Sequence, residues 1–275
     1  MKRILLALIA IGFFMTGSAQ DDSTKQVKDD TIRVGGMIII KRDDGSYKSD
    51  NNHTIVISNR PYKPRNISTN WWIMDFGVNS FVDNTNYGSQ DAQSFAPGLK
   101  DEDGMELTGN SVNVNIWIFM QRLNVYKHVV NLKYGMGLEL NNYHFDDKKI
   151  RFLEDPTQIV LDSNLAGAKK NKLAADYLTV PLMLNFNFTP SRRKGFGFSV
   201  GVSAGYLYSS RQKIKIDSDK YKVKDDFNLR RWKISYIGEI NLGIVKFYGS
   251  YATQSMWEKG LDQTPFNVGL RLGNW

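Results

Sequence analysis

The stretch VNLKYGMGLEL, residues Val130 to Leu140, decides the fold. Every second residue in it is apolar, and the residues between are Asn, Lys, Gly or Glu. A period of two sends successive side chains to opposite faces of a β-strand, whereas an α-helix would scatter both sets around its circumference. We therefore expect a strand with one apolar face and one polar face.

The same alternation recurs along the chain from about Trp71 onward. The alternation is clear in Val112 to Met120, in Leu178 to Phe188 and in Phe196 to Tyr208. In the first of these, one face is apolar and consists of Val112, Val114, Ile116, Ile118 and Met120. The opposite face consists of Ser111, Asn113, Asn115, Trp117 and Phe119. Fainter segments are Trp72 to Val82, Arg231 to Leu242, Val245 to Thr253 and Phe266 to Gly273. Together they predict about eight strands, the smallest number usual for an outer-membrane barrel.

Short and long connections alternate between these segments. The joins at Tyr126 to His128, Thr189 to Gly195, and Leu242 with Gly243 are tight, whereas the other connections are long and polar: Asn84 to Asn110, Asp146 to Asp176, Ser210 to Arg230 and Met256 to Pro265. Bacterial outer-membrane barrels have short periplasmic turns and long external loops. The pattern predicts an all-β fold, a transmembrane antiparallel up-and-down β-barrel in the cell outer membrane, with both termini periplasmic.

Composition and the N-terminus agree with export. Lys2 and Arg3 precede an apolar run from Ile4 to Met15, and Ala19 ends a signal-peptide pattern. The chain has 0 Cys, so it forms no disulfide and has no lipid-acceptor Cys. The net charge of +8 is spread among loops, which argues against nucleic-acid binding. A mean hydropathy of -0.39 is compatible with a barrel, whose lumen-facing residues are polar.

Three regions follow: a signal peptide at 1–19, a periplasmic N-terminal segment at 20–69, and the barrel at 70–275. The middle segment contains two β-prone pieces, Thr31 to Ile40 and His53 to Ser58, separated by the turn-like Asp43 to Gly45. We expect a hairpin or a tether there. Because an isolated hairpin is marginal in water, we expect a hairpin to contact the barrel base or to add a strand to a partner.

With the strands placed, the sequence resembles the Bacteroidota outer-membrane β-barrel proteins grouped around the PorT-like family. The resemblance covers roughly Trp72 to Trp275 and rests on Asp75-Phe76-Gly77-Val78-Asn79, on Gly135 to Tyr143, and on Tyr177-Leu178-Thr179-Val180-Pro181-Leu182-Met183-Leu184. It implies a barrel of about eight strands, and PorT itself is tied to protein secretion. One departure is that Trp275 is out of phase with Val268, Leu270 and Leu272. Either a bulge near Gly273 restores the phase, or the C-terminal recognition signal is weak.

Charged residues fall on the polar parity of several strands, which in a small barrel faces a lumen filled with side chains. We expect them to form a network of ion pairs, because unpaired buried charges are costly. Its members are Lys133, Glu139, Arg231, Lys233, Glu239 and Arg271. A gated ion path is the functional alternative, and we favour a packed plug that fixes the strand register.

Catalytic and metal-binding groups are weakly indicated. His144 lies near Asp146 and Asp147, and small barrel enzymes that act on lipids use a His with an acid at the outer rim. With 3 His in the chain, one close to a carboxylate is expected anyway. The acidic cluster Asp101, Glu102, Asp103 and Glu106 lacks the full spacing of a calcium loop. We therefore expect no catalytic residue, no cofactor and no metal.

Basic residues gather on the third long connection. They could bind lipopolysaccharide phosphates through charge-assisted contacts, although a hydrated charge run explains them equally well. They are Arg211, Lys213, Lys215, Lys220, Lys222 and Lys224.

The sequence thus predicts a structural or partner-binding barrel, with an accessory role in secretion or envelope assembly as one form of it. Its expected partners are outer-membrane lipids, lipopolysaccharide and an unidentified envelope protein. The alternatives are a lipid-modifying enzyme that uses His144, a narrow-pore channel, and a secreted soluble barrel of the lipocalin type, which would place apolar residues inside.

Overall fold

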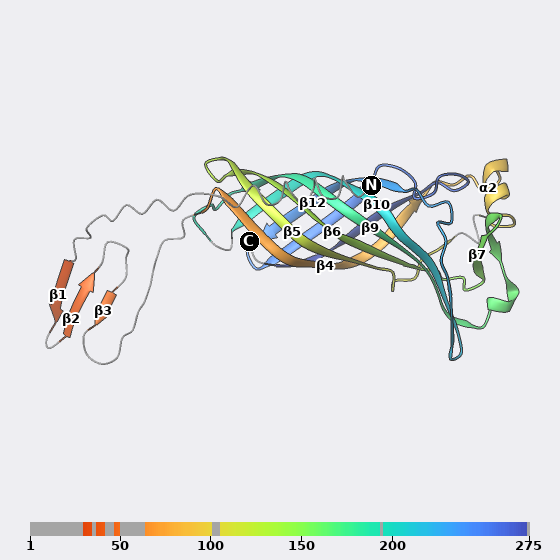
Figure 1. Cartoon of the computed structure of the whole chain (residues 1–275), viewed down its shortest axis with the longest axis horizontal. Helices are drawn as coiled ribbons and strands as arrows, with labels where there is room; N and C mark the ends of the chain where they lie inside the picture. The colour runs from red at the N-terminus through yellow and green to blue at the C-terminus, as the bar shows by residue number, and fades with distance from the viewer. Residues whose placement is uncertain are drawn as a thin grey trace, which may run out of the picture. The chain divides into compact units, whose positions relative to one another are not determined.

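The computed structural model describes residues 64–100, 105–192 and 195–273, and the backbone of three short strands nearer the N-terminus (Figure 1). The chain divides into two units, Met1–Pro61 and Tyr62–Trp275. The expected signal peptide, the piece His53 to Ser58 and Trp275 lie outside the described residues.

In the first unit the three short strands form an antiparallel sheet, β1 (Asp30–Val34), β2 (Met37–Lys41) and β3 (Tyr47–Ser49), in that order. The expected single piece Thr31 to Ile40 is therefore wrong, because it is two strands in which Thr31 pairs with Ile40. The last residue of β1, Val34, pairs with the first residue of β2, Met37.

In the second unit, eight of the described strands form a closed ring. Each is antiparallel to its neighbours, and β14 returns to pair with β4. The ring strands are β4 (Ile67–Asp83), β5 (Val112–Tyr126), β6 (Val130–His144), β9 (Ala168–Asn187), β10 (Phe196–Ile216), β12 (Trp232–Leu242), β13 (Val245–Ala252) and β14 (Gln263–Leu272). This is the up-and-down barrel that the alternation predicts.

The two faces of the ring differ as the sequence indicates. On β10, Val200 and Val202 are 49% and 44% exposed, whereas Ser199 and Ser203 are buried. Leu182 on β9 likewise faces outward. Apolar side chains therefore cover the outside and polar ones fill the lumen, which is the reverse of a lipocalin.

A departure from unbroken alternation in β5 overturns one expectation. A bulge in β5, between Trp117 and Phe119, shifts the phase of its pairing with β6. Phe119 therefore lies outside against Trp71, with ring centroids 5.9 Å apart, and Met120 turns inward and is fully buried beside Ile73. The expectation that Met120 shares the apolar outer face with Val112 is wrong for this reason.

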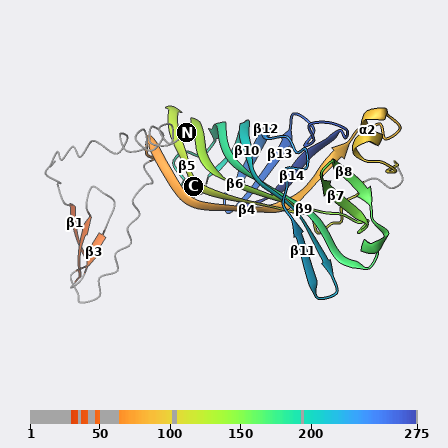
Figure 2. The ribbon, with the colours of Figure 1, turned by 45° about the vertical axis from the view of Figure 1, so that its right-hand side comes forward.

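The long connections, all at one end of the barrel, contain further structure (Figure 2). They carry α2 (Gln90–Phe95), β7 (Ile150–Glu154), β8 (Thr157–Leu161), the 3-10 turn η2 (Ser163–Leu165) and β11 (Asp219–Val223), which extends β10 as a hairpin. We call this the capped end, and the opposite end the tight-turn end. Within the described part of the chain, no helix has the length and apolarity needed to cross a membrane.

Candidate functional site

The middle of the lumen is filled by buried ion pairs that join strands far apart in the sequence. Glu239 on β12 accepts hydrogen bonds from Lys133 on β6 and from Arg271 on β14. Arg271 also binds Asp75 on β4 through two parallel bonds, Nε to Oδ1 at 2.7 Å and Nη2 to Oδ2 at 2.8 Å. A bidentate pair of this kind fixes the orientation of both groups.

A second pair lies beside the first. Lys233 on β12 donates to Glu139 on β6, and its ammonium lies 4.8 Å from the centroid of the Tyr177 ring. Glu139 also accepts a hydrogen bond from Asn141 Nδ2 at 3.1 Å. Asp75, Glu139 and Glu239 thus face Lys133, Lys233 and Arg271, all buried, so that within this group three negative charges meet three positive ones.

Five of the six lumen residues predicted from the sequence come together here, and Arg231 does not. Its side chain is 64% exposed and lies 3.9 Å from Asp226, because β12 begins only at Trp232 and Arg231 is already beyond the barrel wall. Asp75 belongs to the network but was missed. It shares the polar parity of β4 with Asn79, which is the signal that could have found it.

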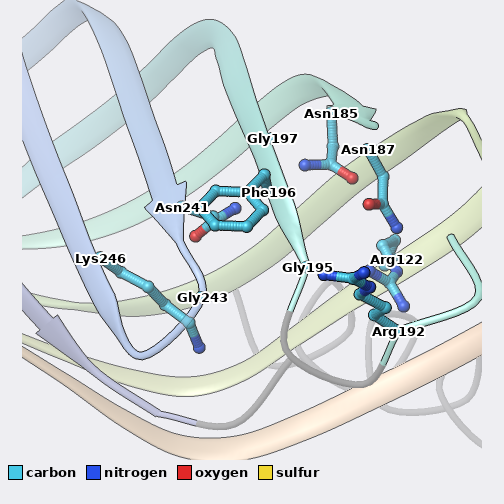
Figure 3. Close-up of a pocket in the computed structure, with 10 residues that line it drawn as sticks. All are labelled: Arg122, Asn185, Asn187, Arg192, Gly195, Phe196, Gly197, Asn241, Gly243 and Lys246. Carbon is cyan, nitrogen blue, oxygen red and sulfur yellow. The ribbon is translucent and has the colours of Figure 1, made fainter. Parts of the chain in front are cut away.

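At the tight-turn end a small concave mouth forms between the strand ends and the turns (Figure 3). Arg122, Arg192 and Lys246 contribute cationic side chains to its wall, Asn187 and Asn241 contribute amides, and no carboxylate is among the described lining residues. Lys246 donates to the backbone carbonyl of Gly273. The mouth is therefore positively charged, whereas the network deeper in the lumen is balanced.

At the capped end the four long connections meet in an apolar core. The Trp257 ring stacks on Phe152 with centroids 5.9 Å apart, and it meets Phe95 edge-on at 5.6 Å. Phe227 completes the contact with Phe152 at 5.3 Å. Trp257 Nε1 also donates to Gln263 Oε1 at 2.8 Å. The sequence shows these connections only as long and polar, whereas in the structure their aromatic residues pack together over the barrel.

The predicted basic residues lie on the β10–β11 hairpin, but one is already neutralised. Arg211 forms an ion pair with Asp176 on β9. Lys213 and Lys215 instead lie opposite Lys172 and Lys170 of β9. Burial, followed by the charges of Lys170 and Lys213, lowers the pKa of Lys172 to about 8. Lys170 and Lys172 are not among the predicted basic residues, because Asp146 to Asp176 was expected to be a connection, whereas β9 begins at Ala168 and carries both lysines beside β10.

His144, at the capped end of β6, is surrounded by cations. Burial, followed by the charges of Lys170, Lys172 and Lys148, lowers its pKa to about 4. Among the described residues its Nε2 has no hydrogen-bond partner. The nearby Asp147 is 3.5 Å from the Lys149 ammonium. In the part of the chain that the structure describes, no carboxylate makes the hydrogen bond to His144 that a catalytic triad requires.

The predicted acidic cluster is only partly described. Asp101, Glu102 and Asp103 lie outside the described residues, and Glu106 is exposed. In the described part of the chain, His, Asp and Glu form no group that could hold a metal ion.

Comparison with known proteins agrees with this architecture. Residues 75–253 match the family model described as outer membrane protein beta-barrel domain. No curated protein matches the chain.

Proposed function

The chain belongs to the outer membrane protein beta-barrel domain family, and from this premise we propose that it is a closed, non-conducting barrel that works by binding a partner at its capped end. The observation that carries the proposal is the balanced, buried ion-pair network across the lumen. We place the capped end outside the cell and both termini in the periplasm, as family architecture favours.

The network supports closure for a physical reason. A conducting lumen hydrates its charges, whereas Asp75, Glu139 and Glu239 are buried residues, each at most 5% exposed. Buried charges that are fully paired resist the entry of ions, because any displacement would leave a partner uncompensated in a medium of low dielectric constant. The lumen charges then fix the strand register.

The cap supports binding. Loops that only close hairpins need no common core, yet Phe95, Phe152, Phe227 and Trp257 come from four connections and pack together. Packing of this kind holds the loop surface in one conformation, which lowers the entropy lost when a partner binds. The resemblance to the PorT-like group favours an envelope protein as that partner, and an accessory role in secretion or envelope assembly.

Planar-bilayer recording tests closure. We expect no conductance steps from the native barrel or from Glu139→Ala, which should lower the heat resistance of the folded barrel because Lys233 loses its partner. The matched control is Glu106→Ala, which removes an exposed carboxylate at the capped end and should change neither property. Conductance steps from the native barrel or from Glu139→Ala would refute a closed plug.

We propose binding rather than catalysis, because no carboxylate forms a hydrogen bond with His144 among the described residues. Assays on phospholipid and lipopolysaccharide substrates should give no hydrolysis product. Hydrolysis by the native barrel that disappears in His144→Ala would instead establish the lipid enzyme.

A further inference from the structure

Six lysines form two rows across three neighbouring strands. In the register of β9, β10 and β11, Lys213 lies directly between Lys172 and Lys222, and Lys215 lies directly between Lys170 and Lys220. Adjacent strands are about 4.8 Å apart, and alternate residues on one strand are about 6.7 Å apart. We call these six residues the lysine lattice.

All six belong to one face of the sheet. The intervening position on β10 is Ile214, which is 7% exposed and packs on the other face against Leu165 and Ala168. The lattice face is therefore the one turned away from this packed cluster, and Lys220 and Lys222 on it are exposed.

Carboxylates near the lattice do not neutralise it. Asp217 at the hairpin tip pairs with Lys169, and Asp176 pairs with Arg211. Among the described residues no lattice lysine is in an ion pair, and the Lys172 ammonium donates to the neutral amide of Asn142. Like charges directly opposite each other on paired strands are destabilising. The fold thus keeps an unfavourable arrangement that a polyanion would relieve.

The hairpin lies beside the membrane-facing wall. Tyr206 and Trp232 form an exposed aromatic pair near the capped end of the wall, with ring centroids 5.1 Å apart, and Lys213 follows further along β10. Aromatic residues in this position mark the membrane interface. In Figures 1 and 2 the β10–β11 hairpin leaves the outline of the barrel and leans to one side. The lattice therefore lies beyond the interface and over the area that surrounding lipid occupies.

We propose that the lysine lattice binds lipid-borne phosphate groups of the lipopolysaccharide type in the outer leaflet. Ammonium groups in two rows can each donate to phosphate oxygens, and such charge-assisted bonds are stronger than neutral ones. Lysine suits this task because its flexible stem lets a point charge follow a mobile headgroup. The inference rests on the proposed outward orientation of the capped end.

The test measures binding of diphosphoryl lipid A to the full-length barrel in nanodiscs. For Lys213→Gln combined with Lys215→Gln we expect binding at least about tenfold weaker, because both rows lose their central charge. The control, Lys100→Gln combined with Lys259→Gln, removes the same charge from exposed sites at the same end and should bind like the parent. Monophosphoryl lipid A should bind more weakly than the diphosphoryl form, and added salt should weaken both.

Stability provides an independent readout. Without lipid A, the backbone amides of β11 should exchange no faster in Lys213→Gln combined with Lys215→Gln than in the parent, because the substitutions relieve like-charge repulsion. Equal binding of diphosphoryl lipid A by variant and parent would overturn the proposal, and so would hexametaphosphate binding as tightly as lipid A. A wrong orientation can be distinguished from a failure to bind lipid A, because labelling of introduced cysteines in intact cells reports the orientation without lipid A.

Discussion

Among the lumen carboxylates, Glu239 should contribute most to the free energy of unfolding, because it pairs with both Lys133 and Arg271. Glu239→Gln should lower the free energy of unfolding by about 3–5 kcal/mol, since removal of one partner leaves buried charge uncompensated. Urea unfolding in detergent micelles measures this. Adding Lys133→Met should recover part of the loss, because one uncompensated cation then disappears. A single variant as stable as the parent would show that Glu239 is not a structural partner.

His144 gives a prediction on pH. Its depressed pKa means that the folded barrel favours the neutral imidazole, so its contribution to stability is full above the ordinary pKa of 6.5 and is lost as pH falls toward about 4. NMR titration should find the His144 pKa well below 6.5, and Lys172→Met should raise it by removing a neighbouring positive charge. An unperturbed titration in the parent would contradict the packing described for this end of β6.

Strand β10 approaches β9 closely at Gly201, which lies on the lumen-facing side of β10. A Cβ on Gly201 would lie 2.1 Å from the carbonyl oxygen of Leu182, whereas a Cβ on Gly238 would meet its nearest atom at 4.0 Å. Gly201→Ala should therefore destabilise the barrel by about 1–3 kcal/mol through overpacking. Gly238→Ala is the matched control and should have little effect. Equal urea midpoints for the two variants would argue against the close approach.

The sequence predicted the ring strands because alternation is local and every strand displays it. It failed at the β5 bulge, since one extra residue reverses the phase without changing the composition around Trp117 and Phe119. It also failed at the cap. Phe95, Phe152 and Trp257 are far apart in the sequence and follow no common period, so that only the closed ring brings them together.

Prediction of the buried charges succeeded where residues lay within a strand and failed at a strand end. Lys233 and Arg231 have the same parity, yet only Lys233 lies inside the wall. Parity assigns a face but does not say how far a strand extends. The lysine lattice likewise depends on how far β9 and β10 extend beyond the barrel wall, because the extension sets which lysines lie opposite each other. Neither segment shows this register in its own sequence.

The two ends of the barrel differ in their turns, their charges and their packing. The tight-turn end offers short turns and a cationic mouth, whereas the capped end carries the aromatic core and the lysine lattice. Short turns belong in the periplasm in outer-membrane barrels, so the lattice should face the outer leaflet. Reversed insertion would place the lattice over the phospholipids of the inner leaflet and leave the cap with no access to the exterior.

Cysteine labelling decides between these orientations, and the absence of native cysteines makes each introduced thiol unique. Ser218 lies at the tip of the β10–β11 hairpin and Ser191 lies in a tight turn, and both are exposed, so Ser218→Cys and Ser191→Cys change little else. In intact cells a membrane-impermeant maleimide should label Ser218→Cys alone, and permeabilisation of the outer membrane should add Ser191→Cys. Labelling of Ser191→Cys alone in intact cells would reverse the assignment of the ends, and with it the leaflet proposed for the lysine lattice.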